Sequence, residues 1–171
     1  MNKALFLDRD GVINEDCHYA HRPEQIVFVD GIFDLTFRAV QMGYKIIVVT
    51  NQAGVAKGYF GEEEVQRLHD WMSKQFMERG VLITSFYYCP YHPRAVEEKY
   101  RIDSEFRKPG PGMVLQAARE HGIDLDKSLM VGDKESDRVR VPGLKTLILK
   151  SKYVQSGYDI ESLSEVYDYL N

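Results

Sequence analysis

The sequence predicts an α/β protein in which a parallel β-sheet carries helices on both faces. Short β-branched apolar runs alternate along the chain with longer segments of helical periodicity, and polar residues or glycine bound each run. This alternation is typical of parallel sheets, because a helix returns the chain after each strand. Such sheets bind ligands beyond the carboxyl ends of their strands, so we expect the functional residues there.

Five apolar runs account for the sheet. Each has the length of a strand and is followed by residues that favour turns. We expect strands at residues 4–7, 45–50, 83–88, 128–131 and 146–149.

Four segments have the spacing of an amphipathic helix. The clearest, residues 62–80, begins with three glutamates and places Val65, Leu68 and Phe76 on one face. Weaker versions of this period occur at residues 32–42, 111–122 and 160–170. Residues 89–109 show no period and are predicted to form a functional loop.

Length and composition indicate a single domain over residues 1–171. The chain is 44% hydrophobic, which supports one sizeable core, and its net charge is −4. Because there is no basic excess, we do not expect it to bind nucleic acid. The apolar start ends at Asp8, too early for a signal peptide or a membrane span, and the sequence holds only two cysteines, Cys17 and Cys89. These features predict a cytoplasmic protein with reduced thiols.

Two carboxylates, Asp8 and Asp10, follow the first predicted strand. Side chains two positions apart in an extended backbone point the same way. One carboxylate can then attack an electrophile and help to hold a cation, while the other donates or accepts a proton. For this pair alone, a solvated strand end or a helix cap remains the alternative.

Hydrogen-bond donors flank two other predicted elements. Thr50 and Asn51 end the second strand, where a hydroxyl and an amide suit phosphoryl oxygens. Arg107 and Lys108 precede a predicted helix start, where the helix dipole already favours an anion. The alternatives are a turn or helix cap for the first pair and a solvated surface pair for the second.

Further carboxylates, Asp133 and Asp137, follow the fourth predicted strand. Mg²⁺ prefers carboxylate oxygens together with phosphate and water. Asp8, the backbone oxygen of Asp10, and Asp133 are therefore candidate ligands. Ordinary helix capping by Asp133 is the alternative.

Taken in order, these motifs resemble those of the haloacid dehalogenase (HAD) superfamily of phosphohydrolases, which use an aspartate nucleophile. More narrowly, residues 8–14, 49–58, 107–109 and 132–134 resemble the D-glycero-D-manno-heptose-1,7-bisphosphate 7-phosphatases. The resemblance covers nearly the whole chain. It implies a Rossmann-like HAD fold with a minimal cap formed by loops, and Mg²⁺ as cofactor. The implied reaction removes the C7 phosphate of a heptose bisphosphate in nucleotide-activated heptose biosynthesis.

The resemblance also implies roles for the matching residues. Asp8 is the expected nucleophile, which forms an aspartyl-phosphate, and Asp10 is the expected general acid and base. Thr50 and Lys108 are expected to hold the transferring phosphoryl group. Asp133 is expected to complete the Mg²⁺ site with Asp8 and Asp10.

Residues around this centre are expected to position the substrate. Asp137 would orient Lys108 or a metal-bound water, and residues 17–22 resemble the loop that covers the active site. The residues implied to contact substrate are Asn51, Arg107, Lys134 and His21. Because the protein is acidic overall, a bisphosphate needs a local cationic funnel. The candidates for this funnel are Arg22, Lys57, Arg107, Lys108 and Lys134.

The family usually carries a zinc site of cysteine and histidine in the loop before its Arg-Lys-Pro motif. Here Cys89 is present, but Tyr91, Ser104 and Phe106 stand where other ligands are expected. Zinc is therefore not expected, and burial of Tyr91 and Phe106 is expected to shape the loop instead. A rebuilt zinc site that uses His92 or residues 17–21 remains the alternative.

Other functions share parts of this pattern. A histidinol-phosphate phosphatase, or a phosphatase for another small sugar phosphate, would use the same catalytic residues. A receiver-like signalling domain also forms an aspartyl-phosphate, but it lacks an acid equivalent to Asp10 that hydrolyses the intermediate. We expect a monomer that acts on a small sugar bisphosphate.

Overall fold

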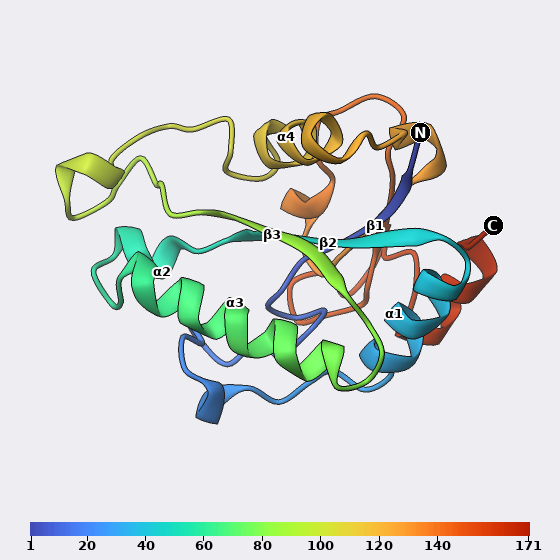
Figure 1. Ribbon diagram of the computed structural model, residues 1–171. Coiled ribbons are helices and arrows are strands. Elements are labelled where there is room, and N and C mark those ends of the chain that lie inside the picture. Colours follow the sequence, from blue (N-terminus) through green and yellow to red (C-terminus); the bar gives the residue numbers. More distant parts are fainter.

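The computed structural model describes residues 1–171 and has a five-stranded parallel sheet at its centre, in the order β3-β2-β1-β4-β5 (Figure 1). The predicted strands are confirmed to within two residues at either end. Their bounds are Lys3–Leu7 for β1, Tyr44–Asn51 for β2, Ile83–Cys89 for β3, Leu129–Gly132 for β4 and Lys145–Ile148 for β5.

The first strand lies in the middle of the sheet. Leu7 is level with Val48 of β2 on one side and with Val131 of β4 on the other. The amide of Asp8 still donates to the carbonyl of Val131, at 3.0 Å, just as the chain leaves the sheet. Because all three strands run the same way, the residues that follow them meet at one edge.

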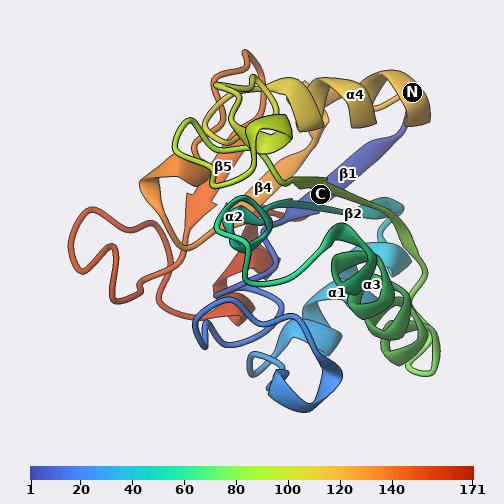
Figure 2. The same ribbon diagram turned by 90° about the vertical axis from the view of Figure 1, so that its left-hand side faces the viewer.

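Helices cover both faces of the sheet, as predicted (Figure 2). One face packs against α1 (Ile32–Gln41), α3 (Glu62–Met77) and a C-terminal 3₁₀ helix, in a core that includes Leu35, Phe76 and Val166. The other face packs against α4 (Gly112–His121), and its core includes Met113 and Ala117. A short helix, α2 (Ala53–Ala56), follows β2. None of the helices is long and apolar enough to cross a bilayer.

One predicted feature at the C-terminal end needs correction. Residues 160–170 do not form an α-helix, because the ordered turns are a 3₁₀ helix over Leu163–Tyr169. Leu163 and Val166, three positions apart, are both buried, and a three-residue repeat suits a 3₁₀ helix. After β4 the chain forms a single 3₁₀ turn, Glu135–Asp137, and the Asp137 carboxylate accepts a hydrogen bond from the amide of Asp133.

Candidate active site

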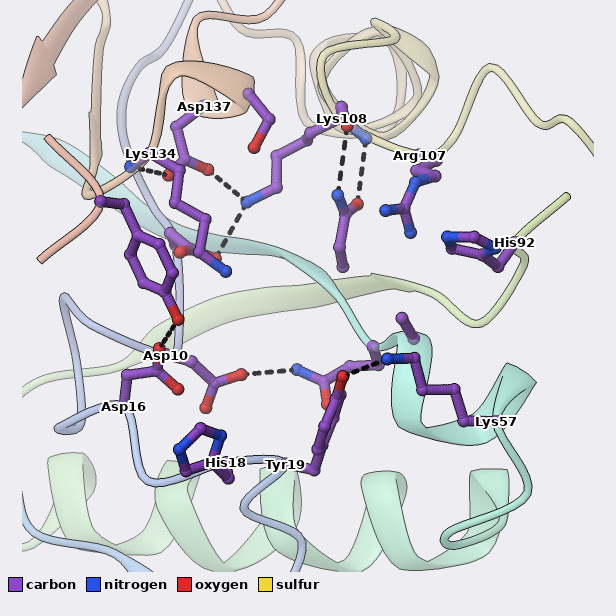
Figure 3. A pocket seen from close by; sticks show the side chains of 16 residues that line it. Asp10, Asp16, His18, Tyr19, Lys57, His92, Arg107, Lys108, Lys134 and Asp137 are labelled. Carbon is purple, nitrogen blue, oxygen red and sulfur yellow. Dashed lines mark hydrogen bonds and ion pairs between the residues drawn. The ribbon is translucent and has the colours of Figure 1, made fainter. Parts of the chain in front are cut away.

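A polar pocket of about 300 Å³ opens at the carboxyl edge of the sheet (Figure 3). Of its 16 lining residues, 3 are hydrophobic. Asp8 and Asp10 come from the end of β1, Asn51 from the end of β2, and Lys108 from the loop before α4. The sheet therefore brings together Asp8 and Lys108, which lie 100 positions apart in the sequence.

Lys108 is buried at the floor of this pocket. Its ammonium donates to Asp8 Oδ1 at 2.9 Å, to Asp137 Oδ1 at 2.6 Å and to the Val49 carbonyl at 2.8 Å. Burial alone would lower the pKa of Lys108, but Asp137 and Asp8 outweigh that effect and raise it. Lys108 is thus a cation with a fixed position, and its contact with Asp137 is compatible with the prediction that Asp137 orients Lys108.

The acidic residues at the floor outnumber the cations bound to them. Ligand oxygens of Asp8, Asp133 and Asp137 all lie within 4.8 Å of one another, and the one ammonium among them is that of Lys108. Burial, followed by the charge of Asp137, raises the pKa of Asp8 well above its usual value and that of Asp133 to about 6. Oδ1 of Asp133 is buried without a hydrogen-bond partner. An unpaired buried oxygen beside excess negative charge fits a divalent cation.

Gly11 allows the chain to pass close to Asp133. Its φ is +93°, and a Cβ at this position would lie 2.0 Å from Asp133 Oδ2. Any other residue would therefore push the carboxylate aside.

Asp10 is held by a different set of partners from Asp8, although the sequence predicts that the two carboxylates point the same way. Arg9 Nη2 donates to Asp10 Oδ1 at 3.0 Å, Asn14 Nδ2 donates to the same oxygen at 3.0 Å, and Gln52 Nε2 donates to Oδ2 at 3.1 Å. The Arg9 side chain is completely buried. These contacts give Asp10 a defined position beside Asp8, the candidate nucleophile, which is bound by Lys108.

Sequence reasoning missed a buried histidine behind Arg9. The Nη1 atom of Arg9 lies 3.2 Å from His69 Nε2, and the ring of His69 stacks on Phe86 with centroids 4.5 Å apart. Burial, and then the charge of Arg9, lowers the pKa of His69 well below its usual value. A signal was present, since His69 lies one turn after Val65 on the apolar face of α3.

The polar residues at the end of β2 bind other parts of the site. Thr50 is fully buried and does not line the pocket, and its hydroxyl accepts a bond from Gln52 Nε2 at 2.8 Å. Asn51 does line the pocket, but its amide is engaged with the Lys108 backbone, with distances of 2.9 and 3.2 Å. Gln52 thus links Thr50 to Asp10, and Asn51 fixes the loop that carries the lysine.

Most of the predicted cationic funnel lines the pocket, on two separate sides. In Figure 3, Lys57, Arg107 and His92 lie on one side, and Lys134 lies on the other. The Nη1 atom of Arg107 is buried without a hydrogen-bond partner. Arg22 is not part of the lining.

His21 also lies outside the lining, so its predicted contact with substrate is not supported by the structure. Its ring stacks on Phe60, with centroids 4.8 Å apart, and Nδ1 is 2.9 Å from the Tyr19 carbonyl. Two neighbours from the same loop, His18 and Tyr19, line the pocket instead, and both have positive φ, at 58° and 59°. This pair of left-handed residues turns the loop so that His18 and Tyr19, and not His21, reach the pocket.

Two further lining residues, Asp16 and Tyr153, were not expected from the sequence. Neither lies next to a strand end, and neither belongs to a motif. Their loops bring them together at the side of the pocket where Lys134 lies.

The loop over residues 89–109 is only partly as expected. Cys89 is buried and Tyr91 is half-buried, but Phe106 is 39% exposed, so the expected burial of Phe106 is wrong. The loop is anchored by Tyr100, whose hydroxyl donates to Glu62 of α3 at 2.8 Å. A hydrogen bond to α3 therefore helps to hold the loop in place, where apolar packing alone was expected to do so.

Comparisons with known proteins agree with this architecture. The HAD-hydrolase-like family matches residues 105–139. A D-glycero-alpha-D-manno-heptose-1,7-bisphosphate 7-phosphatase of Burkholderia mallei is 52% identical, over 80% of this chain and 72% of its own length. A D-glycero-beta-D-manno-heptose-1,7-bisphosphate 7-phosphatase of Pasteurella multocida is 41% identical, over 97% of this chain and 95% of its own. The chain belongs to the heptose-1,7-bisphosphate 7-phosphatase family.

Solved structures place this heptose bisphosphate phosphatase family member among HAD-fold phosphatases. A HAD-like phosphatase from Mesorhizobium loti is 36% identical and superposes with a TM-score of 0.85, over 99% of this chain and 84% of that one. The D,D-heptose 1,7-bisphosphate phosphatase of B. bronchiseptica, complexed with magnesium and phosphate, is 26% identical, with a TM-score of 0.81, over 98% and 97% of the two chains. The predicted HAD fold is confirmed.

Proposed function

We propose that this protein is a Mg²⁺-dependent phosphatase that removes the C7 phosphate of D-glycero-D-manno-heptose 1,7-bisphosphate. The observation that carries the proposal is the buried contact between Asp8 and Lys108 at the floor of a polar pocket, 2.9 Å long, in a member of this family. A carboxylate beside a fixed ammonium can attack a phosphoryl group whose oxygens the same ammonium neutralises.

In the first step, a carboxylate oxygen of Asp8 attacks phosphorus, the P–O bond to C7 breaks, and Asp10 gives a proton to the departing sugar oxygen. Arg9 and Gln52 keep Asp10 in place for this transfer. The sugar leaves as an alcohol, and the phosphoryl group stays on Asp8. The position of Lys108 is maintained by Asp137, so its charge meets the transferring oxygens without reorganisation.

In the second step, Asp10 takes a proton from a water molecule, and the water oxygen attacks the same phosphorus atom. The bond to Asp8 breaks, which releases inorganic phosphate, restores the Asp8 carboxylate and leaves Asp10 protonated for the next cycle. A direct part for Thr50 in holding the phosphoryl group stays a prediction, since its hydroxyl reaches the site through Gln52.

Asp8, Asp133 and the Asp10 backbone oxygen are the residues that would hold Mg²⁺. The unpaired Oδ1 of Asp133 and the excess negative charge of the floor support this assignment. When bound, Mg²⁺ neutralises phosphoryl oxygens and the carboxylates around them.

The second phosphate of the substrate is proposed to bind on the side of the pocket lined by Lys57 and Arg107. Arg107 offers a buried, unpartnered Nη1 donor there, and guanidinium groups bind phosphate well. Lys134 is proposed to approach the substrate from the opposite side.

We further propose that the protein works as a monomer in the cytoplasm, without nucleic acid or membrane, in nucleotide-activated heptose biosynthesis. The net charge of −4 supports a small-molecule substrate over a polyanion. The molar mass in solution, measured by size-exclusion chromatography with light scattering, tests whether the protein is a monomer.

A substrate panel tests the activity. We expect kcat/KM for one or both anomers of the heptose bisphosphate to exceed that for histidinol phosphate at least about tenfold, as selective transition-state binding requires. Phosphorus NMR of the product should show the anomeric phosphate retained. A preference for histidinol phosphate, or loss of the anomeric phosphate, would contradict the proposal.

A further inference from the structure

The guanidinium of Arg9 is completely buried, and one side of it contacts Asp10. Nε donates to Asp10 Oδ1 at 3.2 Å, and Nη2 donates to Oδ1 at 3.0 Å and to Oδ2 at 3.1 Å. Nη2 also donates to the Ala20 carbonyl, at 2.8 Å. Because a guanidinium is rigid and planar, the contacts on its other side also set the direction of the bonds that Asp10 receives.

The other side of this guanidinium meets His69. Arg9 Nη1 lies 3.2 Å from His69 Nε2. Arginine has donors and no acceptor, so Nε2 must accept this bond, and a histidine ring accepts only while it is neutral. Burial and the charge of Arg9 lower the pKa of His69 well below its usual value, which keeps the ring neutral. The one ring proton is then on Nδ1.

The His69 ring has a fixed orientation, because two elements hold it. The residue belongs to α3, and its ring stacks on Phe86 of β3, with centroids 4.5 Å apart and planes 17° apart. The ring of Tyr88, also on β3, meets it at 65°, with centroids 6.0 Å apart. His69 is buried and is not part of the pocket lining. Any effect of His69 on the reaction therefore passes through Arg9.

We infer that His69 is a positioning residue for proton transfer: its Nε2 holds the Arg9 guanidinium, which in turn holds Asp10 in the geometry that the transfer needs. This inference rests on the proposed function, in which Asp10 is the acid and base. Without this acceptor, Nη1 is a buried donor that has lost its partner, and the guanidinium turns to find another. The bonds to Asp10 move with it, because they come from the same plane.

The test compares two substrates that need the acid to different extents. The C7 oxygen of heptose bisphosphate is a poor leaving group unless Asp10 protonates it, whereas 4-nitrophenyl phosphate releases its phenolate without a proton. The kcat/KM value of each substrate includes the transfer of the phosphoryl group to Asp8 and excludes the later hydrolysis. The ratio of the two values, heptose bisphosphate over 4-nitrophenyl phosphate, therefore measures how well Asp10 acts as an acid.

Two variants separate the acceptor of His69 from its aromatic stack. His69→Phe keeps a ring on Phe86 but removes Nε2, and we expect the ratio to fall about tenfold, which is part of the roughly hundredfold to ten-thousandfold that a positioned acid contributes. His69→Gln loses the stack but keeps an acceptor for Arg9, so its ratio should stay within about twofold of the wild type. The matched control is His121→Phe, which removes a ring nitrogen 3.0 Å from the Tyr87 hydroxyl, outside the pocket lining. Its ratio should equal that of the wild type.

NMR of the wild-type protein tests the acceptor without any variant. Correlation of the imidazole nitrogens with the ring protons shows which nitrogen is protonated. We expect the His69 proton on Nδ1 near neutral pH, because Nε2 accepts from Arg9. A proton on Nε2 would overturn the inference.

Kinetic outcomes can overturn it as well. An unchanged ratio in His69→Phe, or an equal loss on both substrates, would mean that His69 serves only stability. A ratio that falls in His69→Gln and not in His69→Phe would mean that the stack matters and the acceptor does not. Thermal melts identify variants that fail to fold, and His69→Leu, which is smaller, replaces His69→Phe in that case. The proposed function is judged separately, from the wild-type rates on heptose bisphosphate and histidinol phosphate, so either conclusion can fail while the other stands.

Discussion

Asp8, the proposed nucleophile, occupies a position in which its negative charge lowers the stability of the fold. It shares a buried site with two other carboxylates, and Lys108 neutralises part of their charge. Unbalanced buried charge of this kind is typical of active sites, because the bound ligand supplies the opposite charge that the fold does not. Changes to this residue should therefore separate activity from stability.

Asp8→Asn is expected to lower kcat by more than about a thousandfold, as loss of a nucleophile does. Because one negative charge leaves the cluster, the melting temperature without Mg²⁺ should stay the same or rise. Both are measured on a preparation checked by mass spectrometry for deamidation. Retention of a tenth of the wild-type kcat would exclude Asp8 as nucleophile.

His69 should contribute a pH dependence to stability. Its pKa is depressed by burial in the fold, whereas in the unfolded chain it is about 6.5. Below that pH the unfolded chain binds a proton that the fold excludes, so stability is full above about pH 6.5 and falls as the pH drops, by up to about 1.4 kcal/mol per unit.

Urea unfolding at pH 7.5 and 5.5 measures this effect. His69→Gln, which retains an acceptor for Arg9, should lose less stability between the two pH values than the wild type. His18→Gln, a change at an exposed histidine, serves as the control. Identical losses in the wild type and His69→Gln would contradict the assignment.

The sequence alone places Asp8, Asp10 and Lys108 at the pocket, because each follows or precedes an element whose period is clear. Asp16 and Tyr153 could not be found this way, since they lie in loops without a period and are brought together by the loops' own hydrogen bonds. His69 was findable in principle, but helical spacing says only that a residue is buried and not what it contacts.

The turn after β1 depends on one close approach, between Gly11 and the Asp133 carboxylate. Gly11 lies where a side chain would enter the space of the Asp133 carboxylate. Gly11→Ala is expected to destabilise the protein by about 1–3 kcal/mol, as backbone strain does, and to reduce activity more than stability alone explains.

Gly157→Ala is the matched control for Gly11→Ala. Its φ is +72°, and no atom lies within 4 Å of the added Cβ, so it carries the conformational cost without the clash. Activity of the folded fraction should fall in Gly11→Ala and not in Gly157→Ala. Equal activities would show that Asp133 tolerates the displacement.

The loop over residues 89–109 is predicted to function without zinc. A structural zinc site needs four ligands, and such sites contribute about 10–16 kcal/mol of apparent binding free energy, so a site cannot persist after losing most of them. Elemental analysis of untagged protein should give far less than one zinc per chain, and activity should return after chelation when Mg²⁺ is added. One zinc per chain, lost in His92→Ala, would establish a rebuilt site.

At the scale of the whole molecule, the acidic floor joins strands β1 and β4, so a bound cation should stabilise the fold. At a concentration of one hundred times its Kd, a ligand adds about 2.7 kcal/mol, which is about 5–10 °C in the melting temperature of a protein of this size. Mg²⁺ should produce this shift in the wild type and a much smaller one in Asp133→Asn. K⁺ at equal ionic strength is the control, and equal shifts with both salts would contradict a specific site.

The class of fold follows from the sequence, but the order of the strands does not. Apolar runs such as residues 45–50 identify strands through their composition, whereas the neighbour of each strand depends on packing between distant segments. The C-terminal segment shows the same limit, because Leu163 and Val166 fit either kind of helix until the core fixes their spacing.

The central place of β1 affects how the protein is made. The ribosome produces β1 first, and β2 and β3 can pair beside it early, but its other edge stays bare until β4 is synthesised. The amide of Ala4 bonds to the Ser128 hydroxyl, 124 positions later. A nascent chain that ends before this point presents an apolar strand edge, which is the kind of surface that chaperones cover and that aggregates form on. It also lacks Asp133, so the emerging chain holds the proposed nucleophile, Asp8, long before it gains the proposed Mg²⁺ ligand Asp133.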